Sequence, residues 1–167
     1  MQFININLKG LNGRPHPCLR HIYTARDAVK ARCHVKFLCC DVYTLEKKAK
    51  FQGGDPKCRL CCSKDSEKIV HIVSICEAYS ELRMRILNEI KIACESSLPR
   101  FEIDDLLQDN FLKTQFILDC SSFNLPLRIN ADSDLYVTVL KLSRDFCYGI
   151  SKLRTEKLKF MQQSIEE

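Results

Sequence analysis

Hydrophobic and polar residues alternate along most of the chain with the spacing of an α-helix. Over residues 25–50, hydrophobic side chains recur every three or four positions, and Thr24 followed by Asp27 is the pattern of a helix N-cap. The pattern predicts one helix over this range, although Val42 and Tyr43 within it favour a strand. The side chains that we expect this helix to bury are Ala28, Val29, Val35, Leu38, Val42 and Leu45.

Two long helices are predicted in the second half of the chain. One runs from Glu77 to about Cys94, before Pro99 breaks the pattern, and the last begins at Ser133 or Asp134. Each has one hydrophobic face, which is typical of a helix that packs on one side and is solvated on the other. The hydrophobic positions are Leu82, Ile86, Leu87 and Ile90 in the first helix, and Val137, Leu140, Phe146, Ile150, Leu153 and Leu158 in the last.

Shorter elements complete the expected fold. Asp104 or Asp105 can cap a short helix, and residues 119–130 predict a loop. Glycines and prolines near the start of the chain predict an irregular lead-in with one strand over residues 3–8. The short helix would carry Leu106, Leu107, Phe111 and Leu112. The fold class is therefore mainly α, a small helical domain with little strand.

Eleven cysteines distinguish an otherwise ordinary composition of 167 residues. The count is odd and lower than that of a typical disulfide scaffold. The first ten residues lack the basic and apolar regions of a signal peptide, and no apolar run is long enough to span a bilayer. We therefore expect an intracellular protein, in the nucleus or the cytoplasm, without membrane contact. In such a reducing compartment, clustered thiols bind metal more often than they form disulfides.

Four Cys and His residues have the spacing of a metal site. Cys58 and Cys61 form a C-x2-C pair, nine residues precede His71, and four more precede Cys76. Three thiolates and one imidazole suit tetrahedral Zn(II), and with all four positions filled the site is predicted to be structural. Cys62 could replace Cys61 at a less usual C-x3-C spacing. The alternative explanation is a C-x2-C pair that arises by chance, together with a histidine that belongs to the core. The Gly53–Pro56 turn before this segment and the predicted helix after it favour the metal site over that alternative.

Apart from the three predicted ligands and Cys62, seven cysteines remain, and they show no second complete ligand set. Cys33 adjoins His34, and His16, Cys18 and His21 lie close together in the sequence, so a second metal is a weak alternative there. Most of these thiols are expected to be small buried hydrophobic groups. The chain then divides into a basic lead-in and helix (1–57), the zinc unit (58–76) and a helical C-terminal region (77–167), within one continuous domain.

Basic residues concentrate before the zinc unit. Up to Arg59 there are twelve Lys and Arg residues against four Asp and Glu residues, whereas fourteen basic and seventeen acidic residues follow. This asymmetry predicts a surface that contacts RNA or DNA phosphates, and a solvated helix face is the alternative. The candidate contacts are Arg26, Lys30, Arg32, Lys36, Lys47, Lys48, Lys50, Lys57 and Arg59. Candidate stacking residues are Tyr23, Phe37, Tyr43 and Phe51, of which Phe37 and Phe51 suit the core at least as well.

An ordered set of short motifs resembles one known family. The set comprises Arg14-Pro15-His16-Pro17, the Ala28–Phe51 segment ending in Ala49-Lys50-Phe51, Asp55-Pro56-Lys57-Cys58-Arg59-Leu60-Cys61, then Glu67, His71, Cys76 and Arg83, and finally Leu142-Ser143-Arg144-Asp145-Phe146-Cys147-Tyr148. From about Arg14 to Lys159, the chain resembles the region after the polymerase core in the reverse transcriptases of LINE-type (non-LTR) retrotransposons of animals. The resemblance implies that Cys58, Cys61, His71 and Cys76 are zinc ligands. It also implies a role in holding template RNA or target DNA near the polymerase.

The chain departs from this family in two respects. Its Cys39–Tyr43 segment lacks a glycine that the family often has, and the polymerase core itself is absent. The pair Asp104-Asp105 lies downstream of the zinc unit without flanking strands, so it does not fit a two-metal polymerase motif. We therefore expect a zinc-binding, nucleic-acid-binding accessory region rather than an enzyme, with no catalytic residues. The alternative is a structural or protein-interaction module whose final helix packs on a reverse transcriptase core or on a second copy.

Overall fold

The computed structural model describes residues 17–95, 100–123 and 133–166, and these residues are predominantly helical. Within these ranges there is no strand, and the β-structure present is a single bridge between Lys57 and Ser66. The mainly α prediction is confirmed. The strand expected over residues 3–8 and the break expected at Pro99 lie outside the described residues. Among the helices described, none has both the length and the apolar character needed to cross a membrane.

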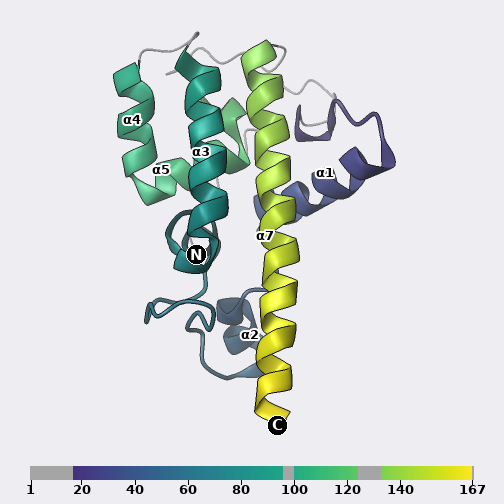
Figure 1. Ribbon diagram of the computed structural model, residues 1–167, viewed down its shortest axis with the longest axis vertical. Coiled ribbons are helices and arrows are strands. Elements are labelled where there is room, and N and C mark those ends of the chain that lie inside the picture. Colours follow the sequence, from purple (N-terminus) through teal and green to yellow (C-terminus); the bar gives the residue numbers. More distant parts are fainter. Residues whose placement is uncertain (1–16, 96–99, 124–132, 167) are drawn as a thin grey trace.

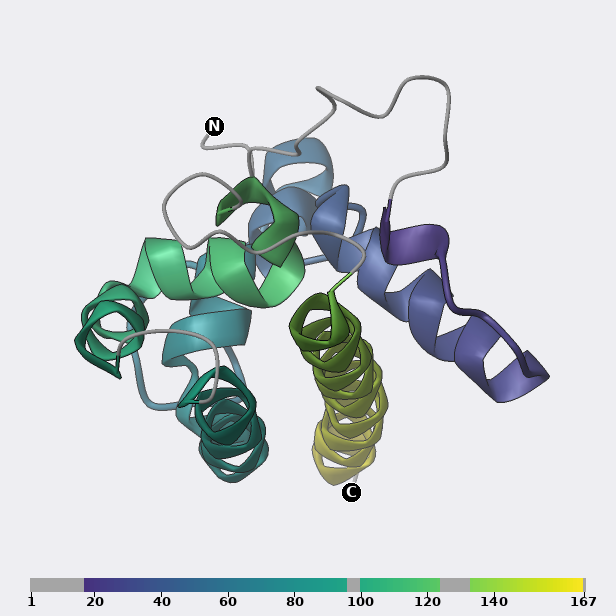
Figure 2. The same ribbon diagram turned by 90° about the horizontal axis from the view of Figure 1, so that it is seen from above.

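Helix α7 (Asp134–Glu166) is the axis of the molecule. Figure 1 shows it running the full height of the view, with α3 (Ser80–Glu95) and α1 (Ala25–Leu38) on opposite sides of its first half. Figure 2 shows the same three helices from above, with α7 end-on between the other two. These two pairs have the most extensive contacts between elements in the fold. The predicted start of α7 is confirmed, because the Ser133 hydroxyl accepts the backbone N–H of Tyr136 at 3.2 Å.

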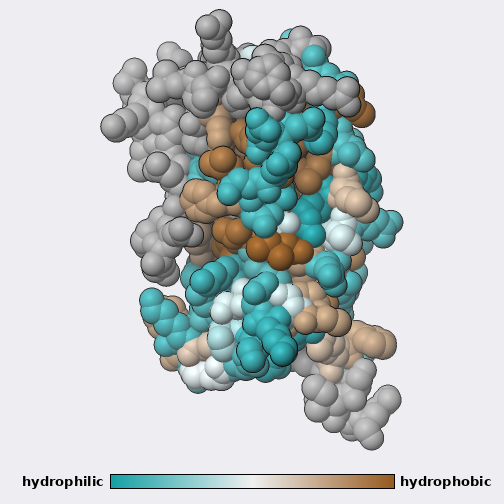
Figure 3. Space-filling view, turned by 90° about the vertical axis from the view of Figure 1, so that its left-hand side faces the viewer, coloured by the Kyte–Doolittle hydropathy of each residue, from teal (hydrophilic) through white to brown (hydrophobic). Residues whose placement is uncertain are grey.

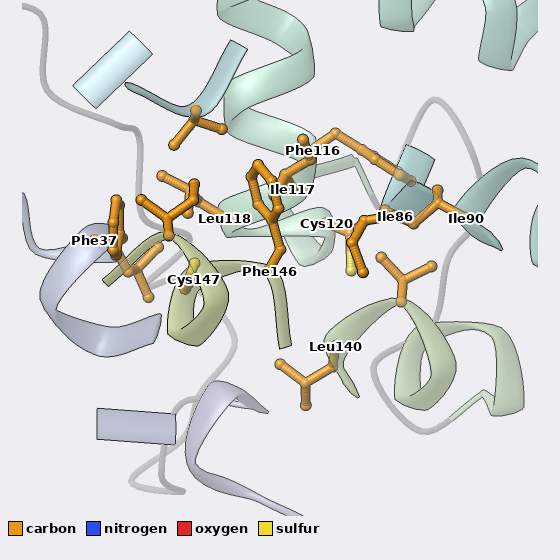
Figure 4. Packing of buried hydrophobic residues seen from close by; sticks show 14 of the residues in the cluster. Phe37, Ile86, Ile90, Phe116, Ile117, Leu118, Cys120, Leu140, Phe146 and Cys147 are labelled. Carbon is orange, nitrogen blue, oxygen red and sulfur yellow. The ribbon is translucent and has the colours of Figure 1, made fainter. Parts of the chain in front are cut away.

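The core lies where α1, α3 and α5 (Asn110–Leu118) meet the first half of α7. Figure 4 shows side chains from all four helices converging there. Burying each of these large side chains contributes about 1.5–3 kcal/mol of transfer free energy, so this cluster dominates the stability of the fold. The predicted faces of α3 and α7 are confirmed at Ile86, Ile90, Leu140, Phe146 and Ile150, all of which are buried.

The helix predicted over residues 25–50 is two helices. The Thr24–Asp27 capping box is present, but α1 ends at Leu38, and α2 (Leu45–Gln52) begins after Thr44, whose hydroxyl accepts the N–H of Lys47 at 3.2 Å. Cys40 has a φ of 53°, in the left-handed region that stops a helix. The expected buried face is therefore wrong in part, because Ala28 and Val29 are exposed, whereas the fully buried face of α1 is Ala31, His34, Phe37 and Leu38.

The short helix expected after residue 99 is also divided. Helix α4 (Arg100–Gln108) packs against α3, and α5 follows it with a cap of its own. Asp104 and Asp105 lie inside α4 and not at its start, which corrects the prediction that one of them is the N-cap. The carboxylate of Asp104 instead pairs with the Lys91 ammonium at 2.6 Å, and Asp109 caps α5 by accepting the N–H of Leu112 at 2.7 Å. Of the four hydrophobic residues expected on one helix, Leu106 and Leu107 lie on α4 and are buried, whereas Phe111 and Leu112 lie on α5.

Candidate metal centre

Cys58, Cys61, His71 and Cys76 converge, with their ligand atoms within 4.8 Å of one another. The Sγ atoms of Cys58 and Cys76 are 3.8 Å apart, and Cys61 Sγ lies 3.4 Å from His71 Nε2. A tetrahedral zinc with bonds of about 2.3 Å to sulfur and 2.0–2.1 Å to nitrogen has S–S edges of about 3.8 Å and S–N edges of about 3.6 Å. The donor set can therefore close around one metal ion with little movement. Cys62 is exposed and lies outside the cluster.

A short loop brings Cys58 and Cys61 together. After α2, Gly53 and Gly54 adopt φ angles of 75° and 107°, which residues other than glycine rarely adopt. These two residues turn the chain into the loop. The bridge between Lys57 and Ser66 closes the loop, and the Cys58 N–H donates to the Asp65 carbonyl at 3.0 Å. The turn between the two cysteines is therefore held at its base by backbone hydrogen bonds.

A single π-helical turn, His71–Ile75, presents the other two ligands. The N–H of Cys76 donates to the carbonyl of His71 at 2.7 Å, a hydrogen bond that spans five residues instead of the four of an α-helix. This wider turn brings two side chains separated by four residues to the same side of the chain. Ile72 and Val73, between the ligands, are fully buried and fix the turn against the core.

Burial sets the protonation of these ligands when no metal is bound. Desolvation raises the pKa of the Cys58 and Cys76 thiols above the usual range. Burial lowers the pKa of His71, and the nearby carboxylates of Asp65 and Glu67 oppose this shift without reversing it. The imidazole is therefore neutral near pH 7, which is the form that binds metals. Thiolates formed on metal binding would have their charge offset by the ion itself.

Arg83 of α3 bonds to the backbone of the turn that carries His71 and Cys76. Its guanidinium is 8% exposed and donates to the backbone carbonyls of Val73 at 3.3 Å, Ile75 at 3.3 Å and Cys76 at 2.8 Å. These bonds fasten the π-helical turn to α3 and hold the backbone of a ligand in place. The sequence assigned no such role to Arg83, because its partners are backbone atoms that leave no trace in the residue pattern.

The nine basic residues predicted to contact nucleic acid are distributed over α1, α2 and the loop closed by the Lys57–Ser66 bridge, which we call the metal loop. Lys30 forms an ion pair with Asp145 of α7, and Lys47 donates to the carbonyl of Cys40. The other seven are exposed: Arg26, Arg32 and Lys36 on α1, Lys48 and Lys50 on α2, and Lys57 and Arg59 beside Cys58. Basic side chains therefore flank the metal loop directly, on its own residues and on α2.

The candidate stacking residues divide clearly. Phe37 is 1% exposed and belongs to the core, whereas Tyr23, Tyr43 and Phe51 are 79%, 53% and 73% exposed. The Lys50 ammonium lies 5.9 Å from the centroid of the Phe51 ring. An exposed aromatic ring with a cation beside it is thus present on α2.

The weak alternative of a second metal site finds no support in the described residues, where no other group of three potential ligands lies close enough together. His34 is buried, and its Nε2 lies 2.8 Å from the carbonyl oxygen of Leu118. Cys18, Cys94, Cys120 and Cys147 are buried, as expected of small hydrophobic groups, whereas Cys39 is exposed. His16 lies outside the described residues.

Comparisons of the chain with protein-family models, with curated proteins and with solved structures find no match.

Proposed function

We propose that Cys58, Cys61, His71 and Cys76 bind one structural Zn(II) ion, and that the basic surface around this unit binds nucleic acid. The observation that carries the proposal is the convergence of three sulfurs and one imidazole nitrogen at distances close to the edges of a zinc tetrahedron. Four protein ligands leave no open position for substrate or water, so the role of the ion is to stabilise the fold. Structural zinc of this type contributes about 10–16 kcal/mol of apparent folding free energy.

Nucleic-acid binding is supported by the side chains that surround the metal loop. Lys57 and Arg59 are exposed on the loop itself, and Lys48 and Lys50 are exposed on the helix before it. Such cations contact phosphates without reading the base sequence. Phe51, exposed beside Lys50, offers a flat surface on which an unpaired base can stack.

The proposal includes an accessory role like that of the region after the polymerase core in LINE-type reverse transcriptases. Three residues of the resembling motif set, Glu67, Arg83 and Arg144, are buried and bond to partners distant in the sequence or to backbone carbonyls. Residues in such positions constrain a fold. This supports the interpretation that the motif set reflects a fold shared with the region after the polymerase core in LINE-type reverse transcriptases. In this role the chain carries no catalytic step, and the polymerase core would hold the growing strand.

A salt series with matched charge variants tests nucleic-acid binding. Zinc-loaded protein should retain labelled single-stranded RNA or DNA in filter binding, with affinity that falls as salt rises from about 50 to 300 mM. Lys57→Gln with Arg59→Gln should weaken retention and reduce the slope of log K against log salt by about 1.4, the value for two phosphate contacts. The matched control, Arg85→Gln with Lys113→Gln, removes the same charge from α3 and α5 and should leave the slope unchanged. No retention at any salt, or equal effects of the two double variants, would contradict the proposal.

A protein-interaction role is the second candidate, and one surface feature favours it. A groove of about 460 Å³ lies between the metal loop and the end of α7, lined by Leu60, Phe160 and Met161 among others, and Phe160 is 70% exposed. Figure 3, which shows the left-hand side of Figure 1, displays further hydrophobic surface in the middle of that face. If such surface binds a polymerase core or a second copy, light scattering should detect self-association that Phe160→Ser reduces. A monomer at high concentration would leave nucleic-acid binding as the better account.

A further inference from the structure

A cavity of about 260 Å³ lies on the opposite side of α7 from α3, between α7, the start of α1 and the segment before α1. Basic groups from three parts of the chain meet there: His21 from the segment before α1, Lys30 from α1, and Lys141 and Arg144 from α7. Two carboxylates, of Asp27 and Asp145, also line it. It is separate from the metal centre, since none of the four metal ligands contributes to its walls.

Arg144 is the buried cation of this cavity. It is 3% exposed, and its Nη1 and Nη2 atoms donate to the backbone carbonyls of His21 at 3.2 Å and Cys18 at 2.8 Å, and also to that of Arg20. All three acceptors are neutral. Its Nε is buried and has no hydrogen-bond partner among the residues that the structure describes. A buried guanidinium without a hydrogen-bonded anion is costly, so this group is suited to hold one.

His21 presents a second unused nitrogen. Its Nε2 is buried without a hydrogen-bond partner in the described part of the chain, while its Nδ1 lies 3.1 Å from the Tyr23 hydroxyl. When that hydroxyl donates to Nδ1, the ring proton resides on Nε2, which is then a donor. His21 has a φ of 57°, a left-handed backbone conformation that is unusual for a residue other than glycine. Strain of this kind persists only where neighbouring contacts enforce it, and here Arg144 holds the carbonyl of the same residue.

The two carboxylates offset only part of the positive charge, because Asp145 is paired with Lys30 and Asp27, whose charge opposes the lowering of the Arg144 pKa by burial, holds the helix cap. Asp27 Oδ2 accepts the N–H of Thr24 at 3.0 Å and its hydroxyl at 2.8 Å in the capping box of α1. Asp145 forms the ion pair with Lys30. Neither Arg144 nor Lys141 is bonded to a carboxylate of the described residues, and the three cations Lys30, Lys141 and Arg144 outnumber the two carboxylates of the cavity.

We propose that this cavity binds a phosphate group, with Arg144 Nε and His21 Nε2 as hydrogen-bond donors and Lys141 as a further positive charge. The volume is somewhat below the range of about 300–1,000 Å³ typical of small-molecule sites, which suits a single phosphate and little beyond the sugar that carries it. Phosphate chemistry is shared by free phosphate and by the phosphate of a nucleic-acid strand. The site rests on its own geometry and does not depend on the metal centre or on nucleic-acid binding at the metal loop.

Calorimetric titration of the zinc-loaded full chain with inorganic phosphate, at constant ionic strength, tests the site. The wild type should bind phosphate in the millimolar range or tighter, and Lys141→Gln should weaken binding about fivefold or more, as expected for loss of one charged contact. Lys159→Gln is the matched control, since it removes one exposed lysine charge from the same helix outside the cavity, and it should bind as the wild type does. No phosphate binding by the wild type, or equal affinities of the two variants, would overturn the proposal.

A second measurement identifies the donors and the source of the phosphate. In nitrogen-15 NMR, phosphate should shift the His21 Nε2 resonance, and an unchanged resonance at saturation would remove His21 from the site and overturn the assignment. An oligonucleotide with a terminal phosphate should compete with inorganic phosphate if the natural source is a strand end. The same oligonucleotide without that phosphate competes only if the site takes a backbone phosphate. Competition by neither strand assigns the site to free phosphate.

Discussion

Glu67 and Arg154 form a two-pronged ion pair that joins the metal loop to the second half of α7. Arg154 Nε lies 3.0 Å from Glu67 Oε1, and Arg154 Nη2 lies 3.0 Å from Oε2. Glu67 is 1% exposed, and its Oε2 also accepts the N–H of Leu45, the first residue of α2, at 2.7 Å. One buried carboxylate thus fastens three segments, which Figure 1 shows side by side at the lower half of α7.

Breaking this pair should destabilise the protein strongly. Glu67→Gln leaves the half-buried guanidinium of Arg154 without a charged partner, and we expect a loss of about 3–5 kcal/mol in the free energy of unfolding. Urea unfolding of the zinc-loaded protein measures it. Glu89→Gln, an exposed change on α3, is the control and should alter stability by less than about 0.5 kcal/mol. Replacing both partners, Glu67→Leu with Arg154→Leu, should recover much of the loss because no unpaired charge remains.

The sequence predicted the parts of this structure that depend on local spacing. The closeness of Cys58 and Cys61 was predictable because C-x2-C is a local pattern, and the face of α3 was predictable because its hydrophobic period is continuous. The break between α1 and α2 was not predicted, because the hydrophobic period continues across it and outweighed the strand preference of Val42 and Tyr43; the left-handed backbone at Cys40 and the Thr44 cap divide the two helices. The Glu67–Arg154 pair joins residues 87 apart, so no local pattern could indicate it.

Metal removal should unfold one part of the protein and spare another. No side chain of α2 is fully buried, and the loop before His71 is held by a few backbone hydrogen bonds, by the Glu67–Arg154 pair and, in our proposal, by the metal. Adding a strong chelator should therefore remove hydrogen-exchange protection from α2 and residues 57–70, whereas the turn from His71 to Cys76 is also held by the core and by Arg83. The buried residues of α3 and of the first half of α7 should keep theirs, since these helices pack mainly against each other and against α1, α4 and α5. Loss of protection throughout the chain would show instead that the core needs the ion.

Single cysteine changes should separate the ligand from its neighbour. Cys61 lies 3.4 Å from His71 Nε2, whereas Cys62 is exposed and outside the cluster. Cys61→Ser should lower the bound zinc well below the roughly one ion per chain expected of the wild type, and Cys62→Ser should leave it unchanged. Metal analysis after gel filtration measures both. The reverse result would assign the ligand to Cys62.

The buried thiol of Cys94 should be nearly inert in the folded protein. It is 1% exposed, and burial raises its pKa to about 11 from an ordinary value of 9.0. Because the thiolate is the reactive form, alkylation at pH 8 should be at least about 100-fold slower in the native protein than in urea. The native rate should also keep rising about tenfold per pH unit above pH 9, where that of the unfolded chain levels off. Timed alkylation read by mass spectrometry tests both expectations, with the exposed Cys62 as the fast internal reference. Equal rates for Cys94 in the native and unfolded states would show that α3 opens readily and that the core around Ile90 is not closed.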